Sequence, residues 1–351
     1  MPLTDVLSKY WGFDRFLPLQ EEAMRCVLNA QDSVVVLPTG GGKSLCFQAP
    51  ALCLDGLAVV ASPLISLMKD QVDALRSCGI PAACLNSSLS REERRDVAGE
   101  IRRGRLRLLY AAPEWLVLAT TIEFLKQANV SLIAIDEAHC ISAWGHDFRP
   151  EYRELRVLRE AFPEVGIHAY TATATVQVRE DIARELCLTD PKILVGSFDR
   201  PNLIYKVERR TGGIRQICEI VDRHSKESGI VYCITRAEVD RTCATLTDLG
   251  YRALPYHAGM DADTRRKNQE AFIKDDVDII VATVAFGMGI DKPNVRYVIH
   301  AGMPKSIEHY QQESGRAGRD GLEAECCLLY SSGDYGQWRR ILESAEAGDP
   351  K

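Results

Sequence analysis

The stretch Ser33-Val34-Val35-Val36-Leu37-Pro38-Thr39-Gly40-Gly41-Gly42-Lys43-Ser44 joins an apolar run to a glycine-rich loop that ends in Lys-Ser. This order predicts a buried strand followed by a loop whose backbone N–H groups converge on phosphate oxygens. Lys43 is expected to reach the terminal phosphates of a nucleoside triphosphate, and the Ser44 hydroxyl to hold Mg²⁺. The full phosphate-loop pattern would have glycine at Leu37, so a plain glycine-rich turn is the alternative interpretation.

A second apolar run, Leu132-Ile133-Ala134-Ile135, ends in two acidic residues, Asp136 and Glu137. A continuous apolar run is typical of a central parallel strand. A carboxylate at the end of such a strand can hold Mg²⁺ beside a phosphate loop, which we expect of Asp136, and Glu137 is placed to polarise an attacking water. His139 follows without a second His or Cys at zinc spacing beside it, which favours hydrogen bonding over metal ligation.

Two arginines stand three residues apart near the end of the chain, in the run Gln312-Glu313-Ser314-Gly315-Arg316-Ala317-Gly318-Arg319-Asp320-Gly321. This spacing puts both on one helical face or in a tight segment bent by glycine. Either Arg316 or Arg319 could neutralise the charge that develops on a transferring γ-phosphate. A solvated pair of surface arginines is the alternative.

Apolar runs alternate with helical patterns along the whole chain. Ile65, Met68, Val72 and Leu75, for example, are spaced as on one face of a helix. This alternation predicts an α/β protein with parallel sheets covered by helices on both faces. Strands are expected at 33–37, 57–61, 106–110, 131–135, 167–171, 229–234, 277–282, 295–300 and 325–330.

The length of 351 residues suggests two domains. We expect the boundary shortly after Arg200-Pro201-Asn202, with a polar, glycine-containing connector at 209–213. The predicted domains are residues 1–205 and 206–345. Because the phosphate loop falls in the first and the arginine pair in the second, arginines of one lobe would complete an ATP site held by the other. Closure and release of that cleft could then drive stepping along a strand.

Composition restricts the classes of partner. The net charge of −6 argues weakly against nucleic acid, but a motor needs only a local basic track, for which the arginines within 102–107 and 149–159 are candidates and solvated helix faces are the alternative. No apolar run reaches membrane-spanning length and the N-terminus lacks a signal-peptide pattern, so no membrane partner is expected. The 12 cysteines include no C-x-x-C pair, and no zinc site is visible.

The three runs, in this order, resemble those of superfamily 2 helicases, and further runs narrow the resemblance to the RecQ family. The resemblance extends from about Leu7 to about Glu343. It implies two tandem RecA-like domains and an ATP-driven DNA helicase that moves 3′ to 5′ on one strand and unwinds duplex in DNA repair or recombination. The further runs lie at 62–71, 140–152, 171–174, 198–203, 256–259 and 282–293.

The resemblance implies an adenine-reading segment upstream of the phosphate loop. Gln20 offers a donor and an acceptor that suit the adenine edge, and Phe13 could stack on the base, with core packing as its alternative. Leu17 stands where the family has arginine, which puts adenine selectivity in question. Asp291 could accept a hydrogen bond from the ribose, or could be a turn carboxylate. The expected ATP-binding residues are Phe13, Gln20, Thr39, Gly40, Gly41, Gly42, Lys43, Ser44 and Asp291.

Trp144, Phe148 and Arg149 lie in a polar segment directly after the acidic pair. Two aromatics and an arginine in a loop are typical of base-stacking contacts, and in the family this loop couples DNA binding to hydrolysis. A structural plug is the alternative for Trp144. Thr171 and Thr173 match the family motif that links the two lobes, although Thr-Ala alternation is also ordinary at a strand end.

The expected cofactors are ATP and Mg²⁺, and the expected partners are single-stranded and forked DNA, with protein partners unknown. The protein would act in the cytoplasm of a bacterium or the nucleus of a eukaryote. Two other functions stay open: a nucleic-acid-binding protein without turnover, and an RNA helicase. Many RecQ proteins continue into a four-cysteine zinc module and a winged helix, so this chain is expected to be either a core fragment or a natural minimal form.

Overall fold

The computed structural model describes residues 1–145, 147–287 and 292–346. The chain divides into two compact units, Met1–Phe198 and Asp199–Lys351. The expected boundary at 205 lies inside strand β8 (Leu203–Arg209), which pairs along its whole length with β13 (Ala324–Tyr330). Because that pairing ties residues 203–205 to the second sheet, the division falls earlier in the chain than the sequence predicts.

The first unit is built on a seven-stranded parallel sheet in the order β3-β4-β2-β5-β6-β1-β7. Its strands are β1 (Ser33–Val36), β2 (Leu57–Ala61), β3 (Ala82–Leu85), β4 (Leu108–Ala111), β5 (Val130–Ile135), β6 (Ile167–Thr171) and β7 (Lys192–Val195). Its helices are α1 (Leu3–Trp11), α2 (Gln20–Leu28), α3 (Leu45–Cys53), α4 (Ile65–Ser77), α5 (Arg91–Arg102), α6 (Pro113–Leu116), α7 (Ala119–Lys126), the 3₁₀ helix η1 (Ala138–Ile141), α8 (Pro150–Glu154), α9 (Val157–Ala161) and α10 (Val176–Glu185).

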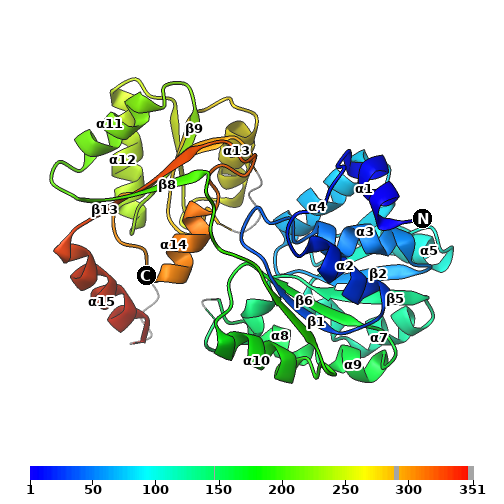
Figure 1. The fold of residues 1–351 in the computed structure, drawn as a ribbon. Helices are drawn as coiled ribbons and strands as arrows, with labels where there is room; N and C mark the ends of the chain where they lie inside the picture. The colour runs from blue at the N-terminus through cyan, green and yellow to red at the C-terminus, as the bar shows by residue number, and fades with distance from the viewer. Residues whose placement is uncertain (146, 288–291, 347–351) are drawn as a thin grey trace. The chain divides into compact units, whose positions relative to one another are not determined.

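Helices cover both faces of this sheet (Figure 1). Successive strand side chains point to opposite faces, so Val35 packs with α2, α3 and α4, whereas Val34 and Val36 pack with α10 and the segment around α8. The central strands are therefore buried on both sides, which explains their continuous apolar runs. The amphipathic spacing from Ile65 forms α4, as expected.

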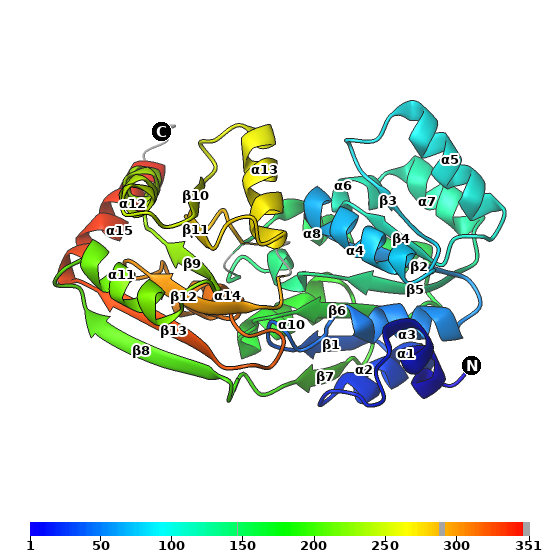
Figure 2. The ribbon, with the colours of Figure 1, turned by 90° about the horizontal axis from the view of Figure 1, so that it is seen from above.

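The second unit holds a six-stranded parallel sheet in the order β10-β11-β9-β12-β13-β8 (Figure 2). Its further strands are β9 (Ser228–Tyr232), β10 (Ala253–Tyr256), β11 (Ile279–Ala282) and β12 (Val295–His300). Its helices are α11 (Ile214–Arg223), α12 (Arg236–Asp248), α13 (Ala262–Ile273), α14 (Ile307–Ser314) and α15 (Ser332–Glu346). One core joins α11 and α12 to the sheet, and a second core on the opposite face includes Phe272 of α13. Two sheets of this kind confirm the predicted fold class.

Every strand expected from the sequence forms, within two residues at either end. The four strands that the sequence analysis missed are β3, β7, β8 and β10, and all four are sheet edges. An edge strand needs no continuous apolar run, and β8 exposes most of its residues. In β10, Pro255 and the polar neighbouring residues weaken the strand pattern of the sequence. Proline cannot donate a hydrogen bond to a neighbouring strand, so it is found mainly in edge strands such as this one.

Asp32, just before β1, ties together the amino-terminal ends of three neighbouring segments. Its buried carboxylate accepts two hydrogen bonds of 2.6 Å from Arg159, one of 2.9 Å from the N–H of Ile167 and one of 2.7 Å from the N–H of Thr189. A buried carboxylate that accepts four hydrogen bonds from three donors is a structural centre, because each donor would otherwise lose its partner.

We predict that Asp32→Ala lowers the free energy of unfolding of the first unit by about 3–5 kcal/mol, the cost of leaving a buried charge unpaired. Urea denaturation followed by circular dichroism measures the change. Asp73→Ala, on the exposed side of α4, is the matched control and should change stability by less than about 0.5 kcal/mol. Equal effects of the two substitutions would refute the structural role.

Candidate functional site

The phosphate loop follows β1 and leads into α3. Gly40 and Gly42 have φ of +83° and +69°, in the left-handed region that favours glycine. A Cβ on Gly41 would lie 2.9 Å from the carbonyl oxygen of Pro38, so the loop is too tight for side chains there. Lys43 Nζ donates a hydrogen bond of 3.2 Å to the carbonyl of Leu37. The result is a side-chain-free bend at the start of a helix, where anions bind favourably.

Gln20 is buried directly beside this loop. Its Oε1 accepts a 2.8 Å hydrogen bond from the N–H of Leu17, and its Nε2 donates to the carbonyls of Gly41 and Gly42 at 3.4 and 3.3 Å. The segment upstream of the loop is therefore fixed to the loop itself. Phe13 is 53% exposed, so core packing, the alternative for this ring, is wrong. Thr39 and Ser44 lie in the same loop segment.

Asp136 ends β5 and is buried. Its Oδ1 accepts a 2.9 Å hydrogen bond from the N–H of Glu137, and its main-chain carbonyl accepts one of 3.0 Å from the Tyr152 hydroxyl. Burial, reinforced by the charge of Glu137, raises the pKa of Asp136, and Lys43 opposes the shift. A buried carboxylate beside a second, partly buried one is stabilised by a nearby cation, so the residues present fit Mg²⁺.

Glu137 has φ +49° and ψ +43°, a left-handed conformation that is uncommon for a residue other than glycine. Its buried Oε2 lies 3.3 Å from His139 Nδ1 and accepts no hydrogen bond from the described part of the chain. A buried carboxylate oxygen in this state can accept a hydrogen bond from a water or ligand. This is the chemistry that the sequence analysis expects of Glu137.

His139 connects the acidic pair to the end of β6. Its Nδ1 lies 2.9 Å from Thr171 Oγ1, and the Thr171 hydroxyl donates a 3.0 Å hydrogen bond to the carbonyl of Thr173. The hydrogen-bonding role expected for His139 is confirmed. Within residues 1–145, 147–287 and 292–346, no group of three or more His, Cys, Asp or Glu could hold a metal ion. An Mg²⁺ ion here would take ligands from the nucleotide, as is usual for this cation.

The aromatic segment after η1 exposes its rings. Trp144 is 70% exposed and Phe148 is 39% exposed, so the interpretation of Trp144 as a structural plug is wrong. The base of the segment is fixed, because Ser142 Oγ donates a 2.6 Å hydrogen bond to Asp181 of α10 and accepts one of 3.2 Å from the N–H of Trp144. Gly145 packs tightly there: a Cβ would lie 2.4 Å from the carbonyl oxygen of His139.

The arginines around this segment make intramolecular contacts. Arg149 pairs with Asp147 at 3.0 Å and donates a 3.2 Å hydrogen bond to the carbonyl of Pro63. Arg159 binds Asp32. In the other arginine cluster, Arg103 pairs with Glu100 at 2.8 Å. These contacts give several of these arginines a structural role, and they do not form a continuous free basic track.

In the second unit, Arg316 is buried and Arg319 is partly exposed. Arg200, which the sequence analysis did not single out, holds their segment: its guanidinium donates to the carbonyls of Ala317 and Gly318 at 3.0 and 2.6 Å. Asn202 donates to the carbonyls of Gly318 and Leu322 at 2.9 and 2.8 Å. The only sequence signal for this role was that both residues lie in the run 198–203, which carried the resemblance without an assigned task. Asp291 lies outside the described residues.

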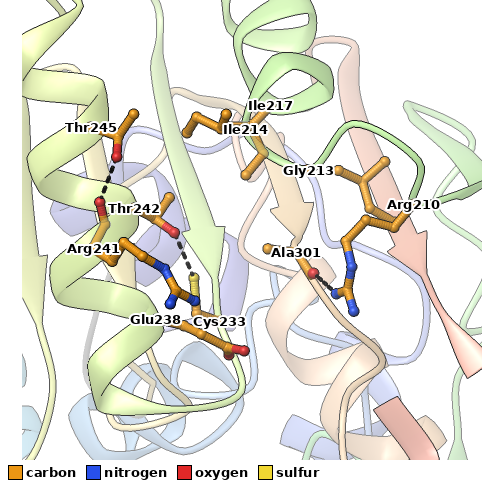
Figure 3. Close-up of a pocket in the computed structure, with 11 residues that line it drawn as sticks. Arg210, Gly213, Ile214, Ile217, Cys233, Glu238, Arg241, Thr242, Thr245 and Ala301 are labelled. Carbon is orange, nitrogen blue, oxygen red and sulfur yellow. Dashed lines mark hydrogen bonds between the residues drawn. The ribbon is translucent and has the colours of Figure 1, made fainter. Parts of the chain in front are cut away.

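The second unit also holds a pocket of about 420 Å³ beside α12 (Figure 3). The Arg210 guanidinium, on one wall, donates a hydrogen bond to the carbonyl of Ala301, and Cys233 lies 3.9 Å from Thr242 Oγ1. None of the catalytic, ATP-binding or DNA-binding residues predicted from the sequence lines this pocket. Its lining residues are Arg210, Gly213, Ile214, Ile217, Cys233, Glu238, Arg241, Thr242, Thr245, Ala301 and Leu329.

Comparison with known proteins agrees with this architecture. Residues 17–182 match the DEAD/DEAH box helicase family, and residues 212–321 match the helicase conserved C-terminal domain. The chain is 48% identical over 338 residues to the ATP-dependent DNA helicase RecQ of Pasteurella multocida, covering 96% of this chain and 54% of that protein. It is 42% identical over 358 residues to ATP-dependent DNA helicase Q1 of Rattus norvegicus, and the alignment covers 99% of this chain and 58% of that protein. The chain thus spans about half the length of these curated relatives.

Among solved structures, the Mycobacterium smegmatis helicase Lhr bound to ssDNA and AMP-PNP superposes with a TM-score of 0.76 at 20% identity, over 100% of this chain and 50% of that one. At this identity the likeness concerns the fold alone. The two family matches follow the order of the two units, and the RecQ relatives align with nearly the whole chain. The chain therefore belongs to the RecQ family of superfamily 2 helicases.

Proposed function

We propose that this chain is an ATP-dependent DNA helicase that moves 3′ to 5′ on single-stranded DNA and separates duplex, with forked DNA as a substrate. The observation that supports it most is the acidic pair of buried Asp136 and partly buried Glu137, within the unit that carries the phosphate loop and seven residues before the exposed Trp144. A nucleotide site and a base-stacking surface on one short segment suit a motor that couples hydrolysis to DNA contact.

The proposed chemistry is hydrolysis of the γ-phosphate. The loop N–H groups and Lys43 would bind the phosphates, and Ser44 and Asp136 would hold Mg²⁺, which would supply positive charge beside the phosphates. Glu137 accepts a hydrogen bond from the attacking water and orients it. Arg319 neutralises charge that develops on the transferring group, since Arg316 is buried and is the less accessible member of the pair.

The remaining roles concern base recognition and coupling. Gln20 and Phe13 would contact the adenine, Asp291 the ribose, and Thr171 with Thr173 would transmit the state of the acidic pair through His139. Trp144 and Phe148 would stack on bases, while Arg149 orders their segment through Asp147. Such a helicase would act in DNA repair or recombination. It would work where chromosomal DNA lies, which is the cytoplasm of a bacterium or the nucleus of a eukaryote. Among the described residues, no helix is long and apolar enough to cross a membrane.

The deciding experiment compares ATPase rates with single-stranded DNA, with RNA and without polymer. Stimulation by DNA well above that by RNA is expected. Stronger stimulation by RNA would favour an RNA helicase, and binding without turnover would favour a nucleic-acid-binding protein.

Lys43→Ala should abolish hydrolysis and leave the fold intact, because the side chain is only partly buried and donates a hydrogen bond to the loop backbone at Leu37. Phosphate release measures turnover and circular dichroism measures folding. Lys126→Ala, an exposed lysine paired with Glu123 on α7, is the control and should keep the full rate. Turnover near the normal rate in Lys43→Ala would exclude the assigned role.

Arg319→Ala should lower the ATPase rate by about 10³-fold, the low end of the effect of arginine fingers, while ATP affinity changes much less. Rate and affinity are measured separately, by steady-state kinetics and by titration with a fluorescent nucleotide. Arg339→Ala, an exposed arginine on α15 paired with Glu343, controls for loss of surface charge. A loss wholly in affinity, or one reproduced only by Arg316→Ala, would contradict the assignment.

Trp144→Ala should keep basal ATPase and much of the DNA affinity but lose stimulation by DNA. Stacking contributes about 1–3 kcal/mol per base, so loss of one ring weakens binding while phosphate contacts persist. A titration of ATPase rate against single-stranded DNA tests this, with Tyr335→Ala, 74% exposed on α15, as control. If saturating DNA restores the full rate, Trp144 is a binding contact only.

A further inference from the structure

Helix α8 contacts both ends of the proposed coupling between DNA and nucleotide. The hydroxyl of Tyr152, a fully buried residue, donates a 3.0 Å hydrogen bond to the main-chain carbonyl of Asp136. The next residue, Arg153, places its guanidinium 4.8 Å from the ring centroid of Phe148 and donates a 3.2 Å hydrogen bond to the carbonyl of Ile141. Two consecutive residues of one short helix thus hold the acidic strand end and the exposed aromatic segment.

The bond from Tyr152 acts on the peptide group that joins Asp136 to Glu137. The carbonyl of that peptide accepts from Tyr152, and its N–H donates to Asp136 Oδ1 at 2.9 Å. Glu137, on the far side of the peptide, has the left-handed φ of +49°. Such a conformation persists only where the surrounding structure holds it. The hydroxyl therefore helps to fix the direction in which the Glu137 side chain leaves the strand.

We propose that Tyr152 is a positioning residue that transmits contact of DNA with Phe148 to the peptide between Asp136 and Glu137. Base stacking on Phe148 displaces or stabilises the Arg153 guanidinium, α8 moves as one turn of helix, and the Tyr152 hydroxyl passes the change to the nucleotide site. This inference rests on the proposed function and assigns a route within it.

The ring and the hydroxyl of Tyr152 can be separated experimentally. The ring belongs to the core that includes Ile133 and Leu155, so Tyr152→Phe keeps the packing and removes only the hydrogen bond. Tyr110→Phe is a matched control in the same unit, because the buried Tyr110 hydroxyl also has a hydrogen bond to lose, a 2.8 Å bond from Gln48 Nε2. Both variants should unfold within a few degrees of the unaltered protein.

The main measurement is binding and not turnover. The dissociation constant of a fluorescein-labelled single-stranded oligonucleotide is determined by anisotropy, once with and once without Mg²⁺ and a non-hydrolysable ATP analogue. The ratio of the larger to the smaller dissociation constant is the coupling factor. In Tyr152→Phe the DNA affinity without nucleotide should stay within about twofold of normal. The coupling factor should fall about fivefold towards one, the effect of a single lost hydrogen bond. Tyr110→Phe should leave it unchanged.

A double-variant cycle tests the route. Arg153→Met removes the contact with Phe148 and should lower the coupling factor, and its combination with Tyr152→Phe should lower it no further, because both act on one path. Additive losses would overturn the route through α8. So would an unchanged coupling factor in Tyr152→Phe, or an equal loss in Tyr110→Phe.

Failure of the inference is distinguishable from failure of the proposed function. If the unaltered protein shows ATPase stimulated by single-stranded DNA while Tyr152→Phe keeps the normal coupling factor, only the role of Tyr152 falls. If the unaltered protein shows no stimulation, the proposed function falls and the inference with it.

Discussion

The burial of parallel strands on both faces is the constraint on which the candidate site depends. A strand covered by helices on both sides admits few polar side chains before it ends, so most functional groups gather at one edge of the sheet. In the first unit β5, β6 and β1 are neighbours. Their ends supply Asp136, Thr171 and the phosphate loop, and the adjacency brings together residues about 100 positions apart in the chain. In the second unit, Arg200 holds the segment that follows Arg316 through the carbonyls of Ala317 and Gly318.

The contacts around the acidic pair form a connected set and not separate supports. His139 links the pair to Thr171, Gly145 packs against the carbonyl of His139, and α8 holds both Asp136 and Phe148. A packed, hydrogen-bonded network has few alternative arrangements, and the coupling that we propose depends on this property. The net charge of −6 is compatible with the proposed function, because base stacking on exposed aromatic rings needs no overall positive charge.

Much of the fold could be predicted because central strands appear in the sequence as uninterrupted apolar runs. The runs at 34–36 and 132–135 are apolar without interruption and form most of β1 and most of β5, whereas Lys192–Val195 and Leu203–Arg209 are partly polar and were missed. Those two strands lie at sheet edges, where one side has no strand neighbour and the pattern weakens. The same effect hid the start of the second unit, since the predicted boundary between residues 205 and 206 divides β8.

The sequence by itself determined which chemical groups are present and which predicted strand each of them follows. These groups are the glycine loop with Lys43, the acidic pair, and the two aromatic residues after it. These are properties of short contiguous segments, set by backbone freedom and local polarity. Only the tertiary structure decided which of these groups are held by partners distant in the chain. Tyr152 binds the Asp136 carbonyl, Arg200 binds the segment after Arg316, and Asp32 binds Arg159. Each of the three is a single polar side chain, and no pattern in the neighbouring sequence indicates its partner. Their roles arise from burial, because a donor or acceptor removed from water must find a partner wherever the fold brings one within reach.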